Sequence, residues 1–212
     1  MDLKKLNYVF KKLFFICLIF LLSSCKKNNI KTLTFSPGPE SAKDAYVTEG
    51  FPKYNYSHLP FLHMLSYTKL DTIDNDSQFL LRFGFASLPQ TLKVDSAFIK
   101  LFAYDKGHFG TNNSFYIEPI TEVWVNKEVN WQNKPKTNSK EAILLSAPSH
   151  KMQDYKIDVT KYVTQVLENK WSNNGHLFRL VDEEKPHKGL RFCSGEHDSV
   201  DKRPKLEIYY HE

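Results

Sequence analysis

The chain has 212 residues, of which 41% are hydrophobic and 14% aromatic, with a formal net charge of +5 at pH 7. Residues 1–24 hold four lysines and one aspartate, so the remainder has 29 − 4 = 25 basic and 24 − 1 = 23 acidic residues, a net charge of +2. This near balance, without a basic arm or clustered basic stretch, argues against a nucleic-acid partner.

Residues 1–24 have the pattern of a secretory leader. Four lysines precede the apolar run Leu13–Leu22, which is too short to span a membrane comfortably. The next residues, Leu22-Ser23-Ser24-Cys25, resemble the bacterial lipobox, in which cleavage just before the cysteine leaves it as the lipid carrier. We therefore expect a lipid on Cys25 and a place in the bacterial cell envelope, on the outer membrane in a Gram-negative cell. An ordinary signal peptide or an uncleaved anchor is the alternative.

The 188 residues after the leader suit one domain. Residues 25–39 are polar and contain Pro37-Gly38-Pro39, which predicts a flexible tether. A single domain over residues 40–212 follows.

Alternation of apolar and polar residues predicts about ten short strands in this domain. In Phe79–Phe85, for example, every second residue is a large apolar one. The predicted strands cover residues 44–47, 61–67, 79–85, 96–104, 115–121, 142–145, 155–158, 176–181, 189–194 and 205–210.

One short helix is predicted near residues 159–169. Asp158 is a suitable N-cap, Val159, Val163 and Val166 have helical spacing, and Asn173-Asn174-Gly175 is a stop signal. Many short strands with one helix indicate an all-β fold, an antiparallel β-sandwich of the jelly-roll type.

Two of the three tryptophans lie in Thr121–Pro135. Trp124 and Trp131 are separated by the polar turn Asn126-Lys127-Glu128, and Pro135 closes the stretch. Large aromatic side chains so close together suggest a local anchor for a core.

Several stretches share one further pattern in their order and spacing. They are Asp44–Val47, Leu80–Phe83 with Leu88-Pro89, Val94 with Ser96–Leu101, Ile120–Trp124, Val129–Pro135, Ile157–Thr160 with Val163, Gly175, Phe192–Glu196 and Arg203–Tyr210. Together they resemble the DNRLRE-domain family, which overlaps carbohydrate-binding module family 96, over roughly residues 40–210. The chain departs from the family pattern at Phe83–Ala86 and at Asn130.

The resemblance implies a non-catalytic jelly roll, with polysaccharide binding in some members, and it makes Trp124 and Trp131 part of the buried framework. We therefore expect a lipid-anchored envelope protein that binds a polysaccharide. The alternatives are a structural or adhesive envelope protein with protein partners and no sugar ligand, and a polysaccharide-degrading enzyme.

Signals for catalysis are poor. The chain has no Gly-x-Ser-x-Gly, His-Glu-x-x-His or phosphate-loop motif. A glycosidase needs two carboxylates across a cleft, and the sequence does not pair acids such as Glu118, Glu122 and Glu196. We expect Cys193 to be a buried, unreactive thiol.

Sugar binding needs an exposed aromatic plane beside amide or charged groups, because the C–H face of a pyranose stacks on the ring while its hydroxyls seek polar partners. Two places offer these residue types: the loop with Tyr54, Asn55, Tyr56 and His58, and Trp171 with its neighbouring asparagines. Packing within loops is the alternative role for each.

A structural calcium ion is a further possibility, because calcium prefers several oxygen ligands. Candidate ligands are Glu40 with Asp44, and the loop residues Asp71, Asp74 and Asp76. The loop lacks the glycine and closing glutamate of an EF-hand, so a solvated acidic loop is the alternative.

Overall fold

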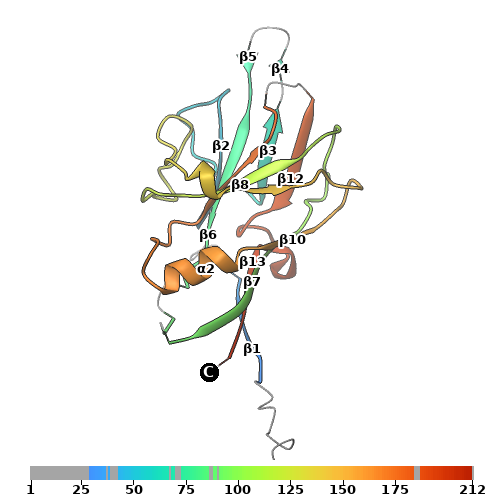
Figure 1. Ribbon diagram of the computed structural model, residues 1–212. Coiled ribbons are helices and arrows are strands. Elements are labelled where there is room, and N and C mark those ends of the chain that lie inside the picture. The colour runs from blue at the N-terminus through green and yellow to red at the C-terminus, as the bar shows by residue number, and fades with distance from the viewer. Residues whose placement is uncertain are drawn as a thin grey trace, which may run out of the picture.

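The computed structural model describes residues 29–36, 38, 43–66, 68–69, 73–85, 88–89, 91–183 and 187–211. Within these residues two antiparallel sheets account for most of the fold (Figure 1). The smaller sheet has four strands in the order β1 (Lys31–Phe35), β13 (Lys205–His211), β7 (Lys93–Leu101) and β10 (Tyr155–Asp158).

The larger sheet has seven strands. Its path is β12 (Lys188–Cys193), β3 (Phe61–Ser66), β6 (Ser77–Arg82), β11 (His176–Leu180), β8 (Phe115–Pro119) and β9 (Ile143–Leu145), and β2 (Lys43–Thr48) pairs with β6. A separate ribbon joins β4 (Thr68–Lys69) to β5 (Ile73–Asp74), and two short 3-10 turns, η1 (Ser139–Glu141) and η2 (Val200–Lys202), lie in loops. The predicted antiparallel sandwich is confirmed.

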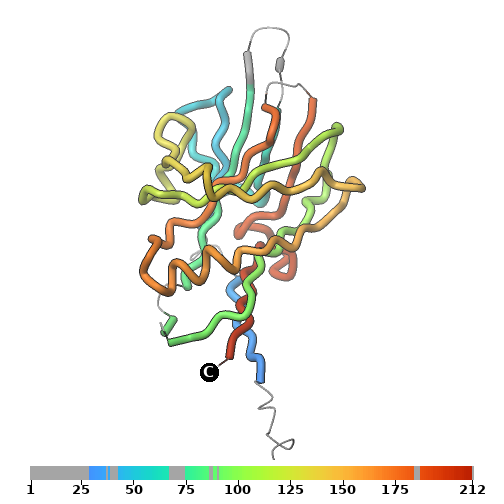
Figure 2. The backbone as a smooth tube through the Cα atoms, viewed as in Figure 1, coloured from blue at the N-terminus to red at the C-terminus, as the bar shows by residue number. Residues whose placement is uncertain are grey.

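β1 was not predicted, and it lies inside the segment expected to be a tether. Its five residues pair with β13 from Lys31 opposite Tyr210 to Phe35 opposite Leu206. Figure 2 shows this pairing as a blue segment running beside a red one at the lower end of the molecule. The expectation of a flexible tether over residues 25–39 is therefore wrong for Lys31–Phe35, which belong to the folded sheet.

The core lies between the sheets and is aromatic. The Phe79 and Phe178 rings stack with centroids 4.2 Å apart, and Phe192 contacts Phe79 edge-on at 6.1 Å. The facing sheet supplies fully buried aliphatic side chains such as Ile99 and Ile208. The inward residues alternate along their strands as the sequence pattern predicted, since every second side chain of a strand points to the same face.

α2 (Thr160–Leu167) follows β10 directly and packs against β7. The N-cap position is Val159 rather than the predicted Asp158, yet the Asp158 carboxylate still accepts a hydrogen bond from the Thr160 amide at 2.8 Å. The helix ends at Leu167, earlier than predicted, because Asn169 turns the backbone to a φ of 57°. Within the described part of the chain, no helix is long and apolar enough to cross a membrane.

Thr121–Pro135 crosses the outer face of the seven-stranded sheet and forms a second, smaller core there. Trp124 is 5% exposed and packs with Val47, Leu80 and Leu177. Its indole Nε1 donates a hydrogen bond to the Asn174 carbonyl at 2.8 Å. Trp131 is only half-buried, so the expectation of buried framework tryptophans holds fully for Trp124 and in part for Trp131.

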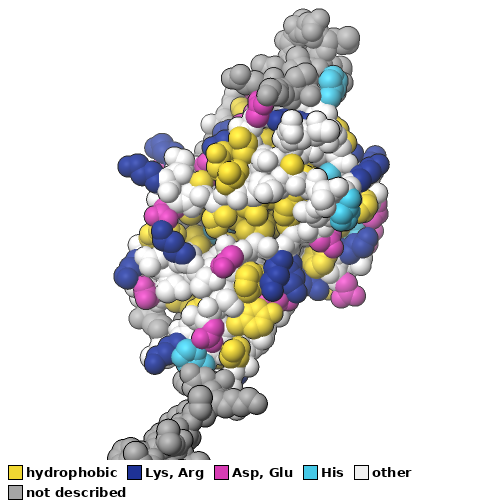
Figure 3. All heavy atoms as spheres, turned by 45° about the vertical axis from the view of Figure 1, so that its right-hand side comes forward, with side chains coloured by type: hydrophobic (Ala, Val, Ile, Leu, Met, Phe, Trp, Pro, Cys, Tyr) yellow, Lys and Arg dark blue, Asp and Glu magenta, His cyan; other side chains and the backbone are white. Residues whose placement is uncertain are grey.

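Charges are mixed over the surface. Figure 3 shows Lys and Arg side chains interspersed with Asp and Glu on the face that it presents. On this face basic and acidic side chains are mixed, in line with the near balance of charges counted in the sequence.

The substitution Trp124→Ala should lower the free energy of unfolding by about 3–5 kcal/mol, because it leaves a cavity in the outer core and removes the hydrogen bond to Asn174. Urea unfolding followed by circular dichroism measures the loss. The neighbouring Val123 is 80% exposed, so Val123→Ala should change stability by no more than about 0.5 kcal/mol. Equal effects of the two substitutions would contradict the buried role of Trp124.

Candidate functional site

Trp171 stands between two hollows. One is about 200 Å³ and the other about 520 Å³, and both are lined by Pro119, Tyr162 and Trp171. Because they share these side chains, the two hollows form one groove, called here the Trp171 groove, with the half-buried indole at its middle.

Local backbone geometry holds Trp171 in this place. The amides of Lys170 and Trp171 both donate to the Gln165 carbonyl, at 2.9 and 3.1 Å, which ties the residue to the end of α2. The chain then returns to β11 through Gly175, whose φ is +79°. A Cβ on Gly175 would lie 2.3 Å from the Leu81 carbonyl oxygen, so only glycine fits this close approach.

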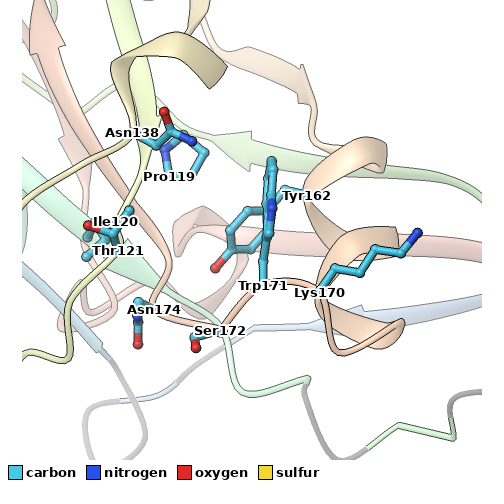
Figure 4. Close-up of a pocket in the computed structure, with 9 residues that line it drawn as sticks. All are labelled: Pro119, Ile120, Thr121, Asn138, Tyr162, Lys170, Trp171, Ser172 and Asn174. Carbon is cyan, nitrogen blue, oxygen red and sulfur yellow. The ribbon is translucent and has the colours of Figure 1, made fainter.

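Figure 4 shows the arrangement in the smaller hollow. The Trp171 indole is at the centre, with Pro119, Ile120, Thr121 and Asn138 on one side and Lys170 on the other. The Lys170 amino group points away from the hollow. The Asn138 backbone amide donates to the Pro119 carbonyl at 2.9 Å, which fixes this loop beside the end of β8.

The larger hollow carries more charge. Lys140, Glu141, Asp158 and Lys161 line it, and Lys161 forms an ion pair with Glu141 across the hollow's rim. The wall therefore presents ammonium and carboxylate groups next to an aromatic surface.

The inner part of the groove is uncharged. His176 is 3% exposed, and burial lowers its pKa to about 3, so its imidazole is neutral at ordinary pH. Among the described residues its Nε2 has no hydrogen-bond partner. The Tyr162 ring lies 4.1 Å from His176, and burial raises the pKa of this tyrosine to about 12.

These groups together match one kind of ligand chemistry. An aromatic side chain with a partly exposed indole supplies a π-face, while amides, hydroxyls and charged groups around it supply hydrogen-bond donors and acceptors. Few convergent polar groups around apolar side chains are the usual composition of a small-molecule or oligomer site.

The sequence pointed to Trp171 but missed Tyr162, Asn138 and His176, which lie around it. These residues are separated by 14 to 38 positions in the chain. They come from the 136–141 loop, α2 and β11, which meet only in the folded chain, so no local pattern could have identified them.

The other sugar-binding candidate, the loop with Tyr54, Asn55, Tyr56 and His58, is tied into the fold. Asn55 Nδ2 donates to the carbonyls of Asn126 and Val129, at 2.8 and 2.7 Å. Tyr56 stacks on Tyr46 at 4.5 Å. His58 is exposed, and Tyr54 is 64% exposed with Phe51, itself 56% exposed, edge-on at 5.9 Å, so this loop keeps an exposed aromatic surface.

A lysine lies much closer to the ring of Trp131 than to the ring of Trp171, where Lys161 Nζ is 5.9 Å from the centroid. The Lys134 Nζ lies 3.3 Å from the ring centroid, and the same amino group donates to Gln78 Oε1 at 3.0 Å. This cation–π contact covers one face of the indole.

The candidate calcium ligands are only partly within the described residues. Glu40, Asp71 and the side chain of Asp74 lie outside them. Asp44 is 1% exposed and its Oδ2 accepts a hydrogen bond from the Gly195 amide at 2.7 Å, while the Asp76 carbonyl accepts one from Glu49. No group of three or more His, Cys, Asp or Glu side chains placed to hold a metal ion occurs in the described part of the chain.

Two of the acids considered for catalysis, Glu118 and Glu122, contact basic residues of the fold, and the Cys193 thiol is buried. Glu118 is 3% exposed and pairs with Arg179 at 2.8 Å. The Glu122 carboxylate accepts a hydrogen bond from the Lys136 backbone amide at 3.0 Å. Cys193 is buried and free, so its predicted burial is confirmed, and burial raises its pKa to about 11, which disfavours the thiolate.

A family model described as carbohydrate-binding module family 96 matches residues 38–210. No curated protein matches the chain. The match covers both sheets except the strand β1 and the last residue of β13, and it includes every side chain that lines the Trp171 groove.

We expect Asp44→Asn to change how stability depends on pH. Burial raises the Asp44 pKa from 3.8 to about 7, so between about pH 4 and 7 the folded chain holds a proton that the unfolded chain has lost. The contribution of the Asp44 carboxyl to the free energy of unfolding therefore falls as pH rises through this window. At pH 8 the uncharged Asp44→Asn variant should be more stable than the wild type by an amount on the order of a few kcal/mol.

Urea unfolding of both chains from pH 4.5 to 8 measures the difference in stability. The opposite trend expected from half-buried His63 and buried His176 is common to both chains and cancels in this difference. Asp198→Asn, at an exposed carboxyl, is the control. A constant difference across the range would contradict the assignment. Stabilisation of the wild type, and not of Asp44→Asn, by added Ca²⁺ would support the calcium hypothesis instead.

Proposed function

Because the chain belongs to carbohydrate-binding module family 96, we propose that it binds a polysaccharide in the Trp171 groove without cleaving it. The observation that carries the proposal is the position of Trp171, a partly exposed indole shared by two hollows. A pyranose ring stacked on this indole places its hydroxyl groups against the polar walls on either side.

The shape of the groove favours an oligomer over a single sugar. The hollows of about 200 and 520 Å³ lie on the two sides of the shared indole. A ligand that fills both must continue past Trp171, as a glycan chain of at least two residues does. The polar groups differ between the sides, with Asn138 and Ser172 lining one hollow and Lys140 and Asp158 lining the other.

We further propose that the protein is a lipoprotein of the cell envelope, anchored through Cys25. The leader pattern and the Leu22–Cys25 sequence support this proposal. Stable anchoring to a membrane takes two membrane-binding signals, such as two acyl chains, and a lipid with several acyl chains supplies more than that. The protein then retains a polysaccharide at the cell surface.

Trp171→Leu should abolish most of the glycan affinity while the domain stays folded. Leucine keeps an apolar side chain against Tyr162 but removes the aromatic plane, so we expect binding at least roughly tenfold weaker, about 1.4 kcal/mol. Affinity electrophoresis or calorimetry against a panel of neutral and acidic polysaccharides measures it, and a thermal melt checks the fold.

Trp131→Leu is the matched control, because Lys134 already covers one face of that ring. Binding lost with Trp131→Leu and kept with Trp171→Leu would refute the assignment of the groove. Release of reducing ends during incubation with the wild-type chain would show an enzyme. Binding by no glycan in the panel would favour the structural role.

Cys25→Ser, expressed as the full chain in a bacterial host, should lose its lipid and leave the membrane fraction. Mass spectrometry of the amino-terminal peptide and detergent partitioning report the two effects. Cys17→Ser, within the leader, should leave both unchanged, since the lipobox requires only the cysteine that follows the cleavage point. A lipid mass that persists in Cys25→Ser would refute the anchor.

A further inference from the structure

A third hollow, of about 390 Å³, lies away from the Trp171 groove. Apolar side chains dominate its lining, which consists of Leu33, Leu88, Pro89, Thr91, Leu92 and Tyr210. These residues come from β1, the segment before β7 and the end of β13. The pairing of Lys31 with Tyr210 and of Lys93 with His211 brings the three segments to one end of the small sheet.

The rim of this hollow has the residue types of a membrane interface. Ile30, next to β1, is 63% exposed. Lys31 and Lys93 are exposed on either side of the end of β13. Asp95, which is also in β7, pairs with His211 at 2.8 Å. Apolar side chains bordered by lysine and tyrosine suit the boundary between lipid headgroups and acyl chains.

Chain length places this end at a bilayer if Cys25 carries a lipid, so the inference rests on the proposed anchor. Cys25 precedes Lys31 by six residues. An extended chain spans at most about 3.6 Å per residue, so Lys31 lies within about 22 Å of the lipidated residue. A bilayer attached so close to β1 meets the end of the domain that carries the hollow.

We propose that this end of the small sheet is a membrane-docking face, in which the hollow and Ile30 contact the lipid and Lys31 and Lys93 meet the headgroups. The domain is then oriented on the membrane rather than swinging freely on a tether. Lipid is the expected partner of this face because β1 belongs to the sheet and begins only six residues after Cys25.

Two threonines test the orientation. Thr91 is exposed and lines the hollow, while Thr111 is exposed in the loop just before β8. In Figure 2 the segment before β7 lies at the lower end with β1, and the loop before β8 lies toward the upper right. Cysteine at either position is therefore accessible to a label, and Cys193, buried, is not.

The experiment uses the full chain, processed and lipidated in a bacterial host and reconstituted in phosphatidylglycerol–phosphatidylethanolamine vesicles that contain brominated acyl chains. A bimane label on Thr91→Cys should be quenched at least twofold more strongly than the same label on Thr111→Cys. Adding Ile30→Asp to Thr91→Cys should reduce that quenching, and Ile30 is exposed enough for the fold to tolerate the change.

Equal quenching of the two labels, or none of either, on a chain whose lipid is confirmed by mass would overturn the docking face and leave the anchor intact. A chain without lipid that stays in solution would refute the anchor, and the docking face with it.

Discussion

The burial of Trp124 links the framework of this protein to its candidate site. Its indole fills the outer core on the seven-stranded sheet and donates a hydrogen bond to the Asn174 carbonyl. Asn174 belongs to the segment that carries Trp171, and the next residue, Gly175, accepts a hydrogen bond from the Ile120 amide. The tryptophan stretch therefore fixes the loop that carries Trp171, the centre of the proposed binding groove.

Burial also sets the ionisation states that the site works with. His176 beneath the groove stays neutral and Tyr162 stays protonated, because charging either would cost its hydration without a counter-ion. The charged groups remain at the rim, where Lys161 pairs with Glu141. A ligand in the groove meets neutral aromatic and imidazole groups at the base and charged groups only at the edges. This arrangement suits a ligand that is recognised by packing and hydrogen bonds.

The two proposals place binding and anchoring in different parts of one sandwich. The groove is formed where β8, η1 and α2 meet, whereas the apolar hollow is formed by the ends of β1, β13 and β7. β1 matters for this separation, because its pairing with β13 makes Lys31, six residues after Cys25, part of the folded sheet. Fewer residues between a sheet and its proposed anchor limit the orientations that a domain can adopt on a surface.

The sequence by itself determined the fold class and the positions of most strands, because alternation such as Phe79–Phe85 reports directly which side chains face a core. It also identified Trp171, the buried Cys193 and the framework role of Trp124. Only the tertiary structure revealed β1, because Lys31–Phe35 becomes a strand by pairing with β13, far away in the chain. Only the tertiary structure shows the surroundings of the two sugar-binding candidates as well: the partners of Asn55 come from another loop, and the walls around Trp171 come from separate elements of the chain. Periodicity encodes which face of an element is buried, whereas a binding surface depends on which distant elements meet.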